Sequence, residues 1–168
     1  MRTVSALDIG SILDVGCGSG ENLAALARFG RYELAEADVS QEALNLARQR
    51  VPSARFLLLD IEREALPEQF DLVISLQTVE HLLDDIAAFR HIAKMARAWV
   101  LISTIAGRMR PSEVAIGHVR NYSTIELARK LECAGMKLER MWGWGFPFYS
   151  RCFAPWLSGS PEAPRWVP

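Results

Sequence analysis

Residues 12–20 read Ile-Leu-Asp-Val-Gly-Cys-Gly-Ser-Gly, an apolar segment that carries one acidic residue and ends in three alternating glycines. The side chains of Ile12, Leu13 and Val15 are typical of a buried strand. The glycines that follow permit positive φ angles, and they remove side chains where a ligand would contact the backbone. This stretch therefore predicts a strand followed by a loop that binds a nucleoside-bearing cofactor.

The glycine spacing separates two classes of cofactor. A dinucleotide-binding loop has the pattern G-x-G-x-x-G, in which the third glycine packs the helix against the strand. Glu21 occupies that place here, and the third glycine comes one residue earlier, at Gly20. The sequence also has no Tyr-x-x-x-Lys pair. A nicotinamide-dependent oxidoreductase is therefore the less favoured alternative.

The composition indicates one globular domain. The chain has 168 residues, of which 50% are hydrophobic and 23% are charged, so we expect a single domain over residues 1–157. The tail over residues 158–168 is rich in Pro, Ser and Gly, and we expect it to be poorly ordered.

Charge, hydropathy and cysteine content exclude several other classes. A net charge of −1 gives no electrostatic indication of nucleic-acid binding. The apolar runs have the length of strands, which excludes a membrane span, and the ten residues before the first strand leave no room for a signal peptide. We therefore expect a cytoplasmic protein. The three cysteines form no C-x-x-C pair, so neither a disulfide framework nor a metal site is expected.

Strand-like and helix-like segments alternate from residue 11 onward, which is typical of an α/β fold with a mostly parallel, twisted sheet and helices on both faces. We expect strands over 12–15, 32–38, 55–60, 70–76, 98–105 and 136–142, and helices over 22–29, 40–50, 84–95 and 123–135. Ser40, Asp84 or Asp85, and Ser123 are expected to begin three of these helices, and Gly30 to end the first. Residues 106–122 are expected to form a long irregular connection of the kind that carries function.

Polar residues follow the strands in a regular way. Asp14 belongs to the first strand, Asp38 and Asp60 close the second and third, and Gln77 follows the fourth. Ligands of open parallel sheets bind beyond the carboxyl ends of the strands. Asp38 lies eighteen residues after Gly20, where a carboxylate can accept hydrogen bonds from both hydroxyls of a ribose. Three carboxylates at successive strands therefore favour a cofactor site over unrelated helix caps.

Four segments carry a family resemblance: LDVGCGSG at 13–20, ADVS at 37–40, LLLD at 57–60 and FDLVISLQTVEHL at 70–82. In order and spacing they resemble the motifs of small class I S-adenosylmethionine-dependent methyltransferases, including the ubiquinone-biosynthetic enzymes. The resemblance covers residues 11–145 and implies a Rossmann-like fold with S-adenosylmethionine as cofactor and S-adenosylhomocysteine as product. The methyl transfer that it implies requires no metal.

The resemblance also implies roles for individual residues. The glycine loop would lie against the methionine and ribose, Asp38 would bind the ribose diol, and Asp60 would accept from the adenine amino group. The full set of expected cofactor contacts is Asp14, Gly16, Cys17, Gly18, Gly20, Asn22, Asp38, Val39, Asp60, Ile61, Leu76, Gln77 and His81.

Candidate catalytic residues come from two further segments that look like parts of these families, Glu80-His81-Leu82 and residues 117–123. If the acceptor is a hydroxyl, its proton must leave, and a histidine is suited to accept it. His118 is the preferred base and His81 the second choice, with Tyr122 orienting the acceptor. If the acceptor is an amine or an activated carbon, neither histidine needs to be essential.

The acceptor class is only partly constrained. Residues 76–79 read Leu-Gln-Thr-Val, and the absence of an N/D-P-P-Y/F motif there disfavours methylation of base amino groups. Aromatic residues concentrate in 141–149 and continue at Phe153 and Trp156. They could line an apolar acceptor pocket or rest on a lipid-like substrate at a membrane surface, or they could cover a sheet edge or an oligomer interface.

Two features depart from the family. Its members carry a longer helical segment before the first motif, and the usual antiparallel seventh strand is not evident after Trp144. The acceptor site could therefore be open or completed by another subunit of a homo-oligomer. A non-catalytic module that binds S-adenosylmethionine and serves as a partner or regulatory subunit remains a second alternative.

Overall fold

The structure is a computed structural model that describes residues 7–29, 31–144, 152–153 and 156–158. Of the tail expected over 158–168, Ser158 is described and belongs to a strand (Trp156–Ser158), whereas 159–168 lie outside the described residues. The aromatic residues within 145–151 and the expected helix end at Gly30 also lie outside them.

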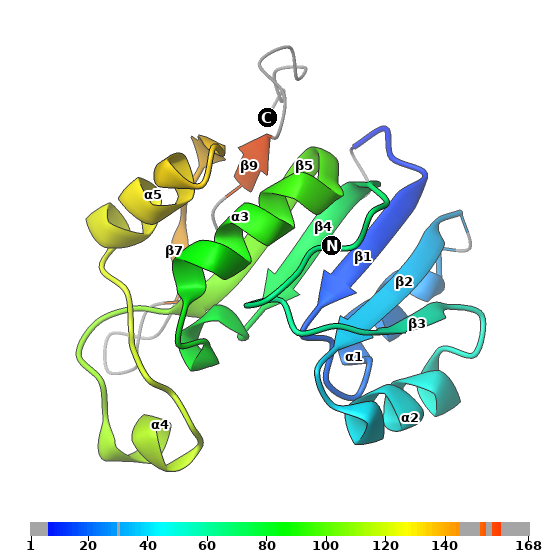
Figure 1. The fold of residues 1–168 in the computed structure, drawn as a ribbon, viewed down its shortest axis with the longest axis horizontal. Helices are drawn as coiled ribbons and strands as arrows, with labels where there is room; N and C mark the ends of the chain where they lie inside the picture. Colours follow the sequence, from blue (N-terminus) through cyan, green and yellow to red (C-terminus); the bar gives the residue numbers. More distant parts are fainter. Residues whose placement is uncertain (1–6, 30, 145–151, 154–155, 159–168) are drawn as a thin grey trace.

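Five parallel strands form the centre of the sheet in the order β3-β2-β1-β4-β5 (Figure 1). These strands are β1 (Ser11–Val15), β2 (Glu33–Asp38), β3 (Arg55–Leu58), β4 (Phe70–Leu76) and β5 (Ala96–Ile105). The chain starts in the middle of the sheet, runs to one edge and then returns to the other side of β1. The strand order therefore reverses between β1 and β4, which is where an open α/β sheet binds its ligands.

Beyond β5 the strands of the sheet pair in the antiparallel direction. Strand β9 (Trp156–Ser158) pairs antiparallel with β5 and with β6 (Lys137–Arg140). Strand β8 (Cys152–Phe153) pairs antiparallel with the end of β5 and with β7 (Gly143–Trp144). The sequence showed no clear sign of the antiparallel strand that usually lies beside the fifth strand. In the described residues, the three-residue β9 lies between β5 and β6.

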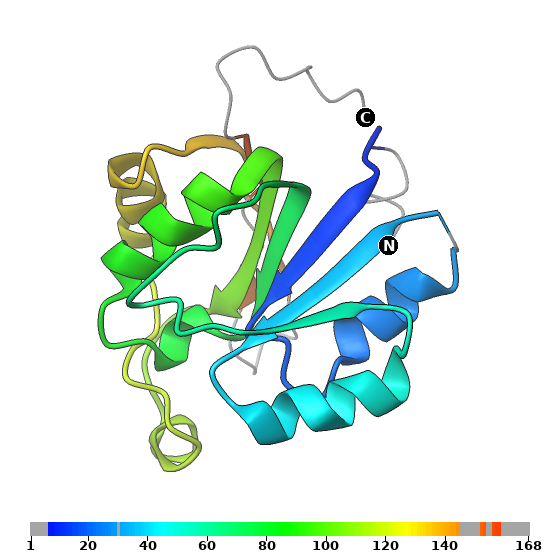
Figure 2. The ribbon, with the colours of Figure 1, turned by 45° about the vertical axis from the view of Figure 1, so that its right-hand side comes forward.

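Helices cover both faces of the sheet (Figures 1 and 2). Helices α1 (Glu21–Ala27) and α2 (Gln41–Arg50) contact the β2 side, whereas α3 (Asp85–Met95) and α5 (Thr124–Cys133) pack together beside β5 and β6. None of the described helices is both long and apolar enough to cross a membrane.

The predicted helix caps are confirmed. The side chain of Ser40 accepts a hydrogen bond from Ala43 N at 3.2 Å. The Asp84 carboxylate accepts one from Ala87 N at 2.9 Å, and the Ser123 hydroxyl accepts one from Glu126 N at 3.1 Å. These bonds satisfy backbone donors that a helix leaves unpaired in its first turn.

The alternation of side chains along the strands divides the core in two. Ile12 of β1 packs with Leu23 and Leu26 of α1 on one face, whereas Leu13 of β1 belongs to the cluster of Phe89 on the other. Successive strand residues point to opposite faces, so both faces of a central strand must be apolar when helices cover both. The nearly continuous apolar strands of the sequence are explained by this layering.

The connection over 106–122 is more ordered than expected. It contains the short helix α4 (Pro111–Ala115), with proline in its first turn and Glu113 Oε2 accepting from Arg110 N at 2.7 Å. Between β4 and α3 the chain also forms the 3-10 turn η2 (Val79–His81). Because η2 follows β4 and α4 follows β5, both short elements lie at the carboxyl edge of the parallel strands, the edge at which such a sheet binds its ligands.

Candidate functional site

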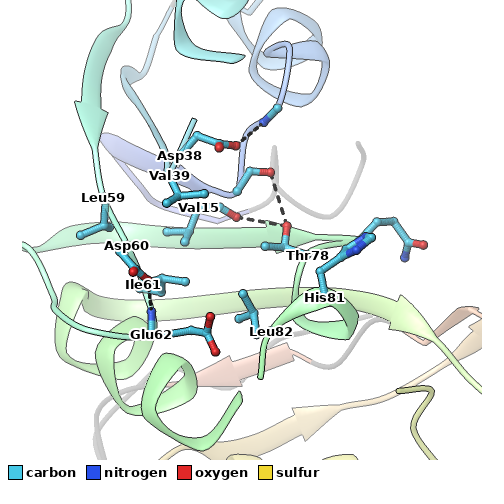
Figure 3. Close-up of a pocket in the computed structure, with 13 residues that line it drawn as sticks. Val15, Asp38, Val39, Leu59, Asp60, Ile61, Glu62, Thr78, His81 and Leu82 are labelled. Carbon is cyan, nitrogen blue, oxygen red and sulfur yellow. Dashed lines mark hydrogen bonds between the residues drawn. The ribbon is translucent and has the colours of Figure 1, made fainter. Parts of the chain in front are cut away.

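A cavity of about 350 Å³ opens at the carboxyl ends of β1, β2 and β4 (Figure 3). Its volume falls in the range of about 300–1,000 Å³ that is typical of small-molecule sites. The cavity is lined by Val15, Gly16, Gly18, Asp38, Val39, Leu59, Asp60, Ile61, Glu62, Gln77, Thr78, His81 and Leu82. Eight of these are residues that the sequence proposed for a cofactor: Gly16, Gly18, Asp38, Val39, Asp60, Ile61, Gln77 and His81.

Two of the loop glycines are required by close packing within the protein. Gly16 has φ 73°, and a Cβ there would overlap the side chain of Thr78. Gly20 has φ 79°, and a Cβ there would lie 2.9 Å from Glu36 Oε2 and 3.0 Å from the Cα of Ala47. Gly18 lines the cavity, and a Cβ on it would meet no atom within 4 Å. The loop therefore has open space for a ligand at Gly18, while Gly16 lets it pack against Thr78 and Gly20 lets it pack against Glu36 of β2 and Ala47 of α2.

The carboxylate of Asp38 organises the wall of the pocket at the end of β2. Its Oδ2 accepts from Gly18 N at 2.9 Å, and its Oδ1 accepts from Ser40 N at 2.9 Å. An ionised carboxylate has about four acceptor positions, so these two bonds leave about two for a ligand. Figure 3 shows Asp38 beside Val39, with a dashed line for the hydrogen bond that its carboxylate accepts from Gly18 N.

The next wall is formed by the segment that follows β3. Asp60 Oδ1 accepts from Glu62 N at 3.1 Å, and its other oxygen pairs with the Arg63 Nε at 3.1 Å. Ile61 is buried, whereas Val39, across the pocket, is 68% exposed. Two aliphatic side chains flanking the space next to Asp60 provide the apolar surfaces that a planar base requires.

The third wall begins at Gln77, the one residue other than glycine with a positive φ, 57°, among those described. Its Nε2 donates to Ser103 Oγ at 3.0 Å, and its backbone N donates to Ser103 O at 2.8 Å. Such backbone strain costs of order 1 kcal/mol or more and clusters at ligand sites. The neighbouring Thr78 hydroxyl lies 3.4 Å from the Gly16 carbonyl oxygen, so it joins this wall to the glycine loop.

The structure does not bring the remaining predicted cofactor residues to the pocket surface. Asp14, at the end of β1, and Cys17, within the glycine loop, are both buried. Asn22 donates to Asp14 Oδ2 at 3.2 Å, and together with Leu76 it lines a separate cavity of about 200 Å³ beside α1. Burial and the surrounding carboxylates raise the pKa of the Cys17 thiol, so this thiol stays neutral.

A buried pair of acidic residues, missed from the sequence, supports the loop from below. Glu36 of β2 and Asp14 of β1 are both fully buried, and neither Glu36 oxygen has a hydrogen-bond partner among the described residues. Burial raises the pKa of each carboxyl to about 7, and the charge of Glu36 contributes to the rise at Asp14. The signal for Glu36 was an acidic residue inside an apolar strand.

Replacing Glu36 with glutamine is expected to stabilise the protein by about 1–2 kcal/mol at pH 8 and by much less at pH 5. The folded pKa of about 7 lies above the usual 4.5, so folding favours the protonated carboxyl. That stability is complete below about pH 4.5 and is lost as the pH rises through 7. Urea unfolding of wild type, Glu36→Gln and the exposed control Glu64→Gln at several pH values measures this. An unchanged pH slope in Glu36→Gln contradicts it.

The two candidate bases lie together at the edge of the pocket. The sequence preferred His118, but His81 is the one with the more accessible side chain. His81 is exposed and lines the cavity, whereas His118 is only 6% exposed and lies behind it. The ring centroids are 4.6 Å apart with an interplanar angle of 85°. His81 Nδ1 lies 3.1 Å from the Gly117 carbonyl oxygen. His81 is therefore the histidine that can face an acceptor.

The acceptor-orienting role predicted for Tyr122 is wrong in this structure. Its side chain is fully buried, and its hydroxyl lies 2.8 Å from Asp85 Oδ2 and 3.1 Å from the Val79 carbonyl oxygen. Asp85 also pairs with Arg120 and Lys130, at 2.6 Å each. The hydroxyl therefore serves an internal network that joins α3 to α5, and the sequence pattern did not distinguish this role from one at the site.

The sheet order and the pocket together define a Rossmann-like protein of the class I methyltransferase fold. Residues 13–99 match the family described as methyltransferase domain, which is slightly more than half of the 168 residues. The chain belongs to this family.

Several curated proteins are similar in sequence. The chain is 32% identical over 130 residues to the methyltransferase GfsG of Streptomyces halstedii, covering 72% of this chain and 47% of that protein. It is 32% identical over 103 residues to the ubiquinone biosynthesis O-methyltransferase of Neisseria meningitidis, covering 56% and 43%. The chain thus spans less than half the length of these relatives.

Solved structures share the fold. Magnesium protoporphyrin IX methyltransferase from Synechocystis, solved with bound S-adenosylhomocysteine, superposes with a TM-score of 0.78 at 19% identity, covering 95% of this chain and 78% of that chain. The (4+2)-cyclase SpnF superposes with a TM-score of 0.79 at 16% identity, covering 90% and 75%. Because a cyclase has this fold as well, the fold alone does not define the chemistry.

Proposed function

We propose that this chain is an S-adenosylmethionine-dependent methyltransferase that acts on a small-molecule acceptor. The observation that carries the proposal is the Asp38 carboxylate, which keeps about two acceptor positions beside the backbone of Gly18 in a cavity of about 350 Å³. A ribose presents two adjacent hydroxyl donors, which matches those positions. Bound S-adenosylmethionine supplies an electrophilic methyl group on a sulfonium.

The other walls fit the rest of an adenosyl cofactor. Val39 and Ile61 offer apolar surfaces to the base, with the Asp60 carboxylate beside them to accept from an amino group. Gln77 and the glycine loop form the side of the cavity toward β4, where the methionine portion would lie. Displacement at a methyl carbon needs no metal or covalent intermediate, so the protein accelerates it mainly by aligning the reactants and excluding water.

For a hydroxyl acceptor we propose that His81, rather than His118, faces the reacting group, because His81 lies on the cavity wall. Three exposed aliphatic side chains lie in the loops that follow η2 and α4, namely Leu83, Ile116 and Val119. They favour an acceptor with an apolar portion, in agreement with the aromatic or lipid-like class expected from the sequence.

Calorimetric titration of the purified chain tests this function. We expect saturable binding of S-adenosylmethionine and S-adenosylhomocysteine, and none of NAD at millimolar concentration. Tight NAD binding would favour an oxidoreductase instead. Cofactor binding without transfer to any acceptor in a screen of phenols, quinones, sugars and isoprenoids would favour a non-catalytic binding module.

A further inference from the structure

Glu80, His81 and His118 bring three possible metal ligands together at the edge of the pocket. One ligand atom from each residue lies within 4.8 Å of the others. Glu80 and His81 come from η2, and His118 comes from the loop after α4. The sequence predicted no metal site, because these residues do not have the short, regular spacing by which such sites are recognised.

Two of these side chains have a buried polar atom that lacks a partner. Neither Glu80 Oε1 nor His118 Nδ1 has a hydrogen bond to any described residue, although both side chains are buried. Buried polar atoms in native proteins are nearly always satisfied by protein, water or an ion. An unpaired carboxylate oxygen next to an unpaired ring nitrogen is the donor set of a cation site.

The surrounding contacts hold these side chains in place. Glu80 Oε2 accepts from Thr104 Oγ1 at 2.8 Å, which fixes the carboxylate and leaves Oε1 open. If His81 Nδ1 donates to the Gly117 carbonyl oxygen, 3.1 Å away, its Nε2 keeps a lone pair for a ligand. Val119 N also donates to the Glu80 carbonyl oxygen at 2.9 Å, so the loop of His118 is fastened to η2. Metal-binding histidines typically have such outer partners.

We propose that Glu80, His81 and His118 bind a divalent transition-metal ion such as Zn²⁺. Two imidazoles and one carboxylate suit Zn²⁺ better than Mg²⁺, which prefers oxygen ligands. Three protein ligands leave at least one coordination position open, and His81 places that position at the cavity wall. If the proposed methyl transfer holds, the ion selects an acceptor with a hydroxyl or carboxylate oxygen. The metal site itself does not depend on that function.

The test is metal binding by the full chain after removal of metal with a chelator. We expect one equivalent of Zn²⁺ to bind in calorimetry, and Co²⁺ to give visible absorption bands from imidazole coordination. His81→Ala and Glu80→Gln should each weaken Zn²⁺ binding by about 10-fold or more. The third histidine of the chain, His91, lies outside the cluster, so His91→Gln should bind as wild type does.

Two results would overturn the metal site: a Zn²⁺ dissociation constant above about 1 mM, or equal affinity in wild type and His81→Ala. Because His81 is exposed, this variant tests the site without disturbing the core. Titration of the metal-free chain with S-adenosylmethionine separates the two proposals. Binding of Zn²⁺ without binding of that cofactor would remove the proposed function and leave the metal site standing.

Discussion

Replacing Asp38 with alanine is expected to weaken S-adenosylhomocysteine binding by at least about 100-fold, as measured by calorimetry. Hydrogen bonds to a charged group contribute about 1.5–3 kcal/mol each, and a ribose diol would make two to this carboxylate. The variant also removes the bonds from Gly18 N and Ser40 N that fix the glycine loop and the start of α2. Both effects act in the same direction.

A ligand comparison distinguishes loss of ribose contacts from distortion of the loop. Wild type should prefer S-adenosylhomocysteine to its 2′,3′-dideoxy analogue, whereas Asp38→Ala should bind the two equally weakly. Glu68→Ala, which removes an exposed partner of Arg55, should keep the wild-type preference. If Asp38→Ala still discriminates between the two ligands, the carboxylate does not bind the diol.

Most of the fold was predictable because its signals are local. Strand-length apolar runs, helix caps at Ser40 and Ser123, and glycines after β1 each act within a few residues. The parts that the sequence left uncertain lie where pairing is between distant parts of the chain. The three-residue β9 has its place because β5 and β6 offer free edges on either side of it, and nothing in so short a segment specifies that pairing.

In the pocket, too, the features that depend on local sequence were predictable and those that depend on distant contacts were not. Asp38, Asp60 and Gln77 were predictable because the ends of parallel strands converge at one edge of the sheet. Tyr122 was misjudged because its partner, Asp85, is distant in sequence. The relative access of the two histidines could not be predicted either, since it depends on how the loop after α4 folds over η2. A strand-end position determines proximity to the site, whereas exposure depends on tertiary packing.

In the chain freed of metal with a chelator, where His81 Nε2 is available, replacing His81 with alanine is expected to lower turnover by about 100-fold or more with a phenol acceptor, because groups that manage proton transfer contribute about 10²–10⁴-fold. His81 lines the cavity, whereas His118 lies behind it, so His81 is the histidine that a group bound in the cavity could contact. The binding of S-adenosylmethionine should change much less than turnover, since the Asp38 and Asp60 walls remain. Steady-state rates and calorimetry on the same protein separate the two quantities.

A comparison of acceptors gives this prediction a readout that a structural role would not produce. His81→Ala should lose far more turnover with a phenol than with an acceptor that has no proton to remove, whereas a structural defect would lower both rates alike. His91→Gln keeps a side-chain donor near the Ile61 carbonyl oxygen, which His91 Nδ1 approaches to 2.7 Å, and it should keep the wild-type rates. Unchanged turnover of the phenol by His81→Ala would mean that His81 does not accept the acceptor's proton.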